Sequence, residues 1–133
     1  MKKFIIGKDD FGIEKVIYQI DKENSIINDL TIIGDKITFE KLSESENSKW
    51  NWAISPPKLY FREIPFQLKN DTLEIDITEN TLDNFDIALY LMNHNDITGK
   101  FIIHNDKIFI FEGHVNILGE ELKLEIEVNL VLE

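Results

Sequence analysis

The chain lacks cysteine altogether and contains only three prolines among its 133 residues. The absence of cysteine excludes disulfide bonds, a thiolate nucleophile and thiolate metal ligands, and it is compatible with a reducing cytoplasm. Long hydrophobic runs are also missing, since no stretch approaches the roughly 20 apolar residues of a membrane span. The basic start at Lys2 and Lys3 is followed by only three apolar residues, fewer than the about 7–15 of a secretory signal. We therefore expect a cytoplasmic protein that begins with an ordinary strand.

Positive charge is scarce in the second half of the chain. Residues 61–133 contain 15 acidic and 5 basic residues, whereas residues 1–60 contain 10 and 9. Residues 71–99 contain seven acidic residues and no basic one. The net charge of −11 argues against nucleic-acid binding, which requires cations to neutralise phosphates, and against binding to anionic membranes. It favours a basic protein partner, because a one-sided charge distribution speeds the capture of partners of opposite sign.

Apolar and polar residues alternate with a period of two along much of the chain, which is typical of half-buried strands. In the C-terminal half this pattern, with turn residues between its segments, predicts a β-meander with strands over 84–93, 97–104, 107–117 and 121–132. Gly113 interrupts the third of these strands and indicates a bulge or a close approach of two backbones. Asn70-Asp71 and Leu118-Gly119-Glu120 are predicted turns.

The first half is less regular, but it also favours strands. We expect them over 13–20, 25–33, 36–42, 49–54, 59–62 and 66–69, with a polar loop at 43–48 and Pro65 at an edge or a bend. Residues 81–92 are ambiguous, because Leu82, Phe85 and Leu89 also fit a helical spacing. The prediction is a single domain over residues 1–133 that is all-β, or α+β if 81–92 form a short helix. About eight to ten strands would form an antiparallel sandwich or barrel.

Three histidines raise the question of a metal site, since imidazole is the commonest metal ligand. In the predicted meander, a two-residue turn at 105–106 places Ile97 opposite His114, so that His94 could approach His114 while His104 could not. Solvent-facing positions explain all three histidines more simply, and we expect no metal and no cofactor.

No catalytic motif is present. The chain contains no phosphate-binding glycine loop, no G-x-S-x-G, no H-E-x-x-H and no calcium-binding loop. Glu112, between Phe111 and Gly113, is the most enzyme-like acid, but a glycosidase needs a second carboxylate across a cleft and the sequence places none there. We therefore expect a protein that is not an enzyme.

Trp50 and Trp52 alternate on a predicted strand, and Tyr60 follows closely. Packing in the core is the simplest explanation of such aromatic residues. Tryptophans also anchor protein partners and stack on sugar rings, so a small-ligand or carbohydrate-binding β-barrel that uses Trp50, Trp52 and Tyr60 is an alternative. Trp50, beside the polar loop 43–48, is the better interface candidate if it is exposed.

Acidic residues at alternate strand positions would form a coherent surface. If the strands that carry Glu74, Asp76, Asp86, Glu125 and Glu127 share a sheet, their outer faces make one anionic patch. The candidate binding residues are Asp71, Glu74, Asp76, Glu79, Asp83, Asp86, Trp50 and Trp52.

In its size, its acidity and its lack of cysteine, the chain resembles bacterial immunity proteins of polymorphic-toxin and contact-dependent inhibition systems. The resemblance is to this class as a whole and rests on the acidic stretch 71–96 rather than on a motif. It implies a cytoplasmic, non-catalytic binding module that neutralises a cognate basic toxin, often a nuclease. Carboxylates would meet lysine and arginine of the toxin, and aromatic residues would supply the desolvated anchors. The sequence leaves the oligomeric state open.

Overall fold

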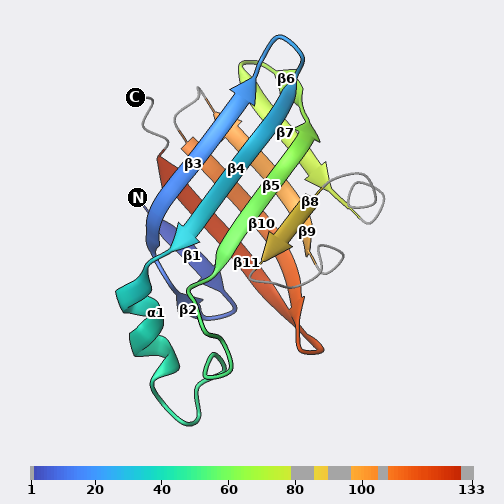
Figure 1. Cartoon of the computed structure of the whole chain (residues 1–133). Helices are drawn as coiled ribbons and strands as arrows, with labels where there is room; N and C mark the ends of the chain where they lie inside the picture. Colours follow the sequence, from blue (N-terminus) through green and yellow to red (C-terminus); the bar gives the residue numbers. More distant parts are fainter. Residues whose placement is uncertain (1, 79–85, 90–96, 105–107, 130–133) are drawn as a thin grey trace.

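The computed structural model describes residues 2–78, 86–89, 97–104 and 108–129, which form an antiparallel β-sandwich with one short helix (Figure 1). The larger sheet contains seven strands in the order β2 (Asp9–Asp10), β1 (Lys3–Ile6), β11 (Glu120–Asn129), β10 (Ile108–Ile117), β9 (Ile97–His104), β7 (Thr72–Ile77) and β6 (Gln67–Lys69). The smaller sheet contains β3 (Ile13–Asp21), β4 (Ile26–Gly34), β5 (Lys58–Pro65) and β8 (Asp86–Leu89), in that order. The helix α1 (Lys36–Ser43) lies between β4 and β5 in the chain.

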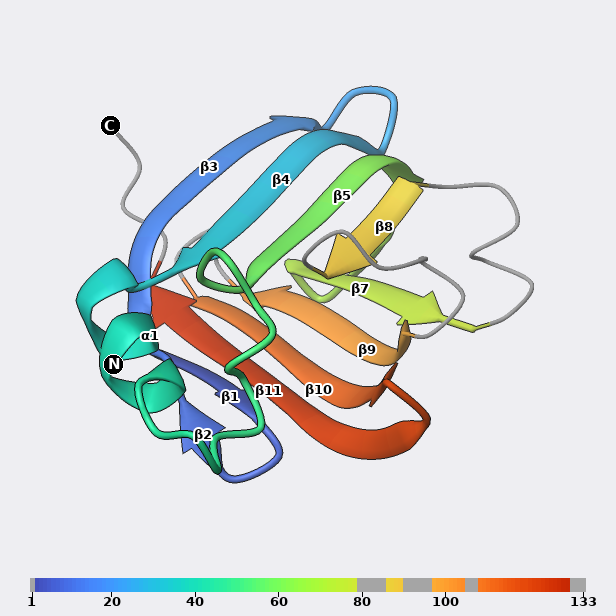
Figure 2. The same ribbon diagram turned by 60° about the horizontal axis from the view of Figure 1, so that its bottom comes forward.

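The two sheets lie face to face and enclose an apolar core (Figure 2). Phe61 of β5 packs against Phe101 of β9 and Phe111 of β10, with ring centroids 5.1 and 6.3 Å apart. Among the residues whose burial is described, no polar or charged side chain is buried. Most of the apolar strand positions whose burial is described point inward, as the alternation predicts, while Ile17 of β3 and Leu68 of β6 are exposed. In the same part of the chain, no helix is long and apolar enough to cross a lipid bilayer.

The predicted meander is confirmed for its last three strands, which run antiparallel as β9, β10 and β11. The prediction was wrong about the strand before them, because β8 pairs with β5 in the smaller sheet and β9 pairs with β7 instead. Sequence neighbours usually pair, but here the chain changes sheets between β8 and β9. The register differs by one residue, since Thr98, rather than Ile97, lies opposite His114.

The helix lies at a different place from the one considered in the sequence. Residues 36–42, predicted as a strand, form α1, whereas residues 86–89 of the ambiguous segment 81–92 form a strand and its other residues lie outside the described part. Asp35 caps α1, because its carboxylate accepts hydrogen bonds from the backbone nitrogen and the hydroxyl of Thr38 at 3.0 and 2.8 Å. These bonds lower the pKa of Asp35. On the apolar side of α1, the buried Phe39 stacks on Phe11 with ring centroids 6.4 Å apart.

The segment 49–54, also predicted as a strand, consists of turns within a long loop between α1 and β5. Trp50 is 1% exposed and packs edge-to-face against Phe11 at 5.3 Å between ring centroids. Its indole nitrogen donates a hydrogen bond of 2.7 Å to the carboxylate of Asp9. The alternation of Trp50 and Trp52 therefore arises from a loop that places one tryptophan in the core, and not from a strand.

Candidate binding surface

The outward side chains of the larger sheet bring together acidic residues from several strands. Six carboxylates and three lysines lie on this side of β1, β7, β9, β10 and β11, at positions that alternate with buried ones. We call this set the acidic face; its members are Glu74, Asp76, Glu112, Glu121, Glu125 and Glu127 with Lys3, Lys100 and Lys123. The set has an excess of three negative charges, and it includes residues far apart in the sequence because β1 and β7 flank the C-terminal meander.

The charges are arranged in rows across the strands. Register places Glu125, Glu112, Lys100 and Asp76 side by side on four consecutive strands. Glu112 therefore lies directly opposite another carboxylate, Glu125, which is unfavourable between neighbouring strands. Lys100 on the other side of Glu112 offsets part of this repulsion. No acidic neighbour of Glu112 was predicted, and the structure supplies one in Glu125.

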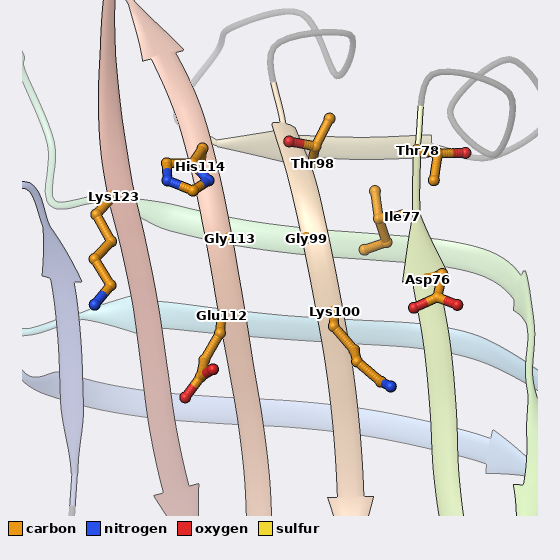
Figure 3. Close-up of a pocket in the computed structure, with 10 residues that line it drawn as sticks. All are labelled: Asp76, Ile77, Thr78, Thr98, Gly99, Lys100, Glu112, Gly113, His114 and Lys123. Carbon is orange, nitrogen blue, oxygen red and sulfur yellow. The ribbon is translucent and has the colours of Figure 1, made fainter.

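A shallow open depression lies in the middle of the acidic face (Figure 3). Ile77, Gly99 and Gly113 form its floor. Charged side chains border it on one side, and His114, Thr78 and Thr98 border it on the other. Gly99 and Gly113 are paired in register, and a Cβ added to Gly113 would lie only 2.7 Å from the Cα of Gly99. The predicted close backbone approach at Gly113 is therefore confirmed.

Lysines of the same face neutralise some of its carboxylates. Lys3 lies 3.3 Å from Glu125 and 3.7 Å from Glu127, Lys123 also pairs with Glu125, and Lys100 lies 3.6 Å from Glu74. Hydrogen bonds from Lys123 and Lys3 lower the pKa of Glu125, and the bond to Glu125 raises the pKa of Lys3. Ion pairs at a surface are weak and exchange readily with solvent. The lysines reduce the negative potential of this face and leave it net anionic.

The outer face of the smaller sheet has a different character. Its regular rows contain Lys15, Lys58 and Arg62 with the carboxylates of Asp21 and Asp29, the second of which lies 3.7 Å from Arg62. The guanidinium of Arg62 also lies over the ring of Tyr60, 5.5 Å from its centroid. Two further acids, at positions 14 and 63, lie where the regular pairing of these strands is interrupted. Among the described strand residues, the acidic excess is therefore greater on the larger sheet than on the smaller one.

The predicted binding residues separate into several groups. Glu74 and Asp76 belong to the acidic face, and Asp71 is exposed in the adjoining β6–β7 turn. Asp86 lies in β8 of the smaller sheet, where its backbone pairs with Arg62, so the expectation that its strand shares a sheet with Glu74 was wrong. The remaining two acids, at positions 79 and 83, lie outside the described residues.

The two tryptophans of the predicted set differ in accessibility. Trp50 is buried, so it cannot contact a partner directly, and Trp52 is 40% exposed. The predicted binding set lacks four members of the acidic face, although two of them, Glu125 and Glu127, were expected in the anionic patch; the other two are Glu112 and Glu121. The signal for all four was their position on the polar side of the two alternating strands 107–117 and 121–132, which pair with each other.

Metal ligands are not grouped in the described part of the chain, where no three of its histidine, aspartate and glutamate side chains could hold an ion together. His94 lies outside the described residues. His114 lies at the edge of the depression, beside Thr98. The chain matches no protein-family model, no curated protein and no solved structure.

Proposed function

We propose that this protein is a cytoplasmic, non-catalytic binding module that neutralises a cognate basic toxin, a nuclease being the favoured class. In this proposal it acts as an immunity protein of a polymorphic-toxin or contact-dependent inhibition system. The observation that carries the proposal is the acidic face, where six carboxylates outnumber three lysines on one side of a rigid sheet.

Electrostatics supports a cationic macromolecule as the partner. Gathering carboxylates on one face costs self-repulsion, as between Glu112 and Glu125, and gives a field that accelerates the approach of a positive surface. The depression at Gly99 and Gly113 lets a protruding lysine or arginine of the partner approach the strand backbones between these acids. Binding there would cover toxin residues that contact nucleic-acid phosphates, since such residues are themselves basic.

The carbohydrate-binding alternative receives less support from the positions of its three aromatic residues. Trp50 is 1% exposed and packs in the core, whereas Tyr60 lies on the outer face of β5 beneath Arg62. Trp52 belongs to the loop between α1 and β5. Because the buried Trp50 cannot stack on a sugar, this alternative is left with Tyr60 on the outer face of β5 and Trp52 in the loop.

The test begins with the protein encoded by the adjacent gene, purified in an inactivated form. We expect tight binding whose association rate falls steeply with salt, because steering by exposed charges is screened. The double variant Glu112→Gln with Glu74→Gln should lower the association rate at low salt by about tenfold. The matched control, Asp29→Asn on the smaller sheet, should leave it unchanged.

A genetic experiment gives an independent answer. Deleting this gene while the neighbouring gene is expressed should prevent growth, and deleting both should restore it. Normal growth of the single deletion, together with no binding between the purified proteins, would refute the proposed function.

A further inference from the structure

Most of the exposed large apolar side chains lie at the same end of the sandwich. Of the six such side chains in the part of the chain whose burial is described, four lie there: Ile37, Trp52, Ile54 and Leu118. They come from α1, from the loop between α1 and β5, and from the β10–β11 turn, which share the lower end of Figure 1 and come forward in Figure 2. Ile54 is 91% exposed. We call these four side chains the apolar end.

The loop that contains Trp52 and Ile54 is anchored to the core by Trp50. The indole nitrogen of Trp50 donates to Asp9 at 2.7 Å, and its backbone nitrogen donates to the hydroxyl of Ser48 at 3.1 Å. That hydroxyl in turn donates to a backbone carbonyl at the end of α1. A loop anchored by a buried tryptophan loses little conformational freedom when a partner binds, so its exposed apolar side chains can contribute efficiently to affinity.

The apolar end is continuous with the acidic face. Lys49, in the same loop, lies 3.0 Å from the carboxylate of Glu120, the first residue of β11. Leu118 precedes Glu120 by two residues, and Glu121, a member of the acidic face, follows it directly. The β10–β11 turn therefore joins the acidic face to Leu118 of the apolar end, and the ion pair of Glu120 with Lys49 joins it to the loop.

Charge decides between the possible occupants. A second copy of this chain would bring its own net charge of −11 against the first, and the resulting repulsion opposes such a dimer. A basic protein is attracted to the same end by the neighbouring acidic face. The combination of an apolar centre with a charged margin is the usual composition of a protein interface, in which exposed tryptophan often supplies much of the binding energy.

We infer that the apolar end is the desolvated anchor of the interface with the basic protein partner, which inserts apolar side chains of its own against Trp52 and Ile54. This inference rests on the proposed function and adds the site that sets the lifetime of the complex. The acidic face governs association, and the apolar end governs dissociation, because rim charges mainly change association rates while packed contacts mainly change dissociation rates.

The test uses the whole chain and the inactivated product of the adjacent gene. Ile54→Ser and Trp52→Ala should each raise the dissociation rate about tenfold or more, with the association rate and its salt dependence unchanged. Ile17→Ser is the matched control, because Ile17 is 48% exposed on the outer face of the smaller sheet, and it should leave both rates unchanged. Thermal unfolding of all three variants should match the wild type.

Each outcome points to one conclusion. Binding of the wild type with unchanged dissociation rates for both loop variants would overturn the inference and leave the proposed function intact. Failure of the wild type to bind would refute the proposed function itself. Concentration-dependent dimerisation that Ile54→Ser abolishes in analytical ultracentrifugation would show that a second copy occupies this end, and it would also overturn the inference.

Discussion

Replacing Gly113 by alanine tests whether β9 and β10 can pair at the centre of the larger sheet only because Gly99 and Gly113 lack side chains. The new Cβ would lie well under 3.0 Å from the carbonyl oxygen of Thr98, 2.7 Å from the Cα of Gly99 and 3.0 Å from the ring of Phe111. Two of these atoms belong to the backbone of β9, so no side-chain rotation relieves the contact. Overpacking that side chains can absorb costs roughly 1–3 kcal/mol, and we expect Gly113→Ala to cost about 3 kcal/mol or more.

The control is Gly119→Ala in the β10–β11 turn. Gly119 has a φ of +85°, and a Cβ added there meets no atom within 4 Å. Its replacement by alanine should therefore lower the free energy of unfolding only through the strain of a left-handed backbone, by about 1–2 kcal/mol. Urea unfolding followed by tryptophan fluorescence gives both values, provided that the m value is unchanged. If Gly113→Ala is no more destabilising than Gly119→Ala, the argument from close backbone approach is wrong.

Two further changes test the loop anchor and the charge pairs. Trp50→Phe removes the hydrogen-bond donor to the carboxylate of Asp9 and reduces the volume of the core side chain. Urea unfolding should therefore show a free energy of unfolding lower by about 2 kcal/mol. An unchanged free energy would mean that Trp50 does not anchor the loop. Hydrogen bonds from Lys123 and Lys3 lower the pKa of Glu125 below its ordinary 4.5. The ionised carboxylate of Glu125 should therefore stabilise the fold fully above pH 4.5, and this stabilisation should disappear as the pH falls through the lowered pKa. The difference in unfolding free energy between the wild type and Glu125→Gln should shrink over that range, and a constant difference would contradict the assignment.

The sequence determined the class of fold, because a period of two between apolar residues, repeated along many segments, is typical of strands with one buried face. It also located several turns from residue type alone. Asn70 and Asp71 have φ values of 53° and 63°, and Leu118 has 53° beside Gly119, as expected of tight hairpin turns. Gly113 likewise indicated a bulge or a close approach of two backbones, and the structure shows the close approach.

The local pattern of apolar residues did not predict α1 or the loop that follows it. Residues 36–42 have enough alternation to resemble a strand, and the signal for a helix was the Asp35 cap with Thr38 three residues later. An eight-residue helix is unstable alone, so the stacking of Phe39 on Phe11 decides its formation. Trp50 likewise adopts its place through contacts with Phe11 and Asp9, which lie about forty residues earlier.

The binding surface shows the same division. Composition determined that the second half is acidic, and alternation determined which acids face outward from a given strand. Which strands share a sheet depends on long-range pairing, and no periodicity encodes it. Pairing of β8 with β5 removed Asp86 from the acidic face, and pairing of β10 with β11 placed Glu112 opposite Glu125. The tertiary structure therefore decided which carboxylates act together, because only the assembled sheet brings strands that are distant in sequence within reach of one partner.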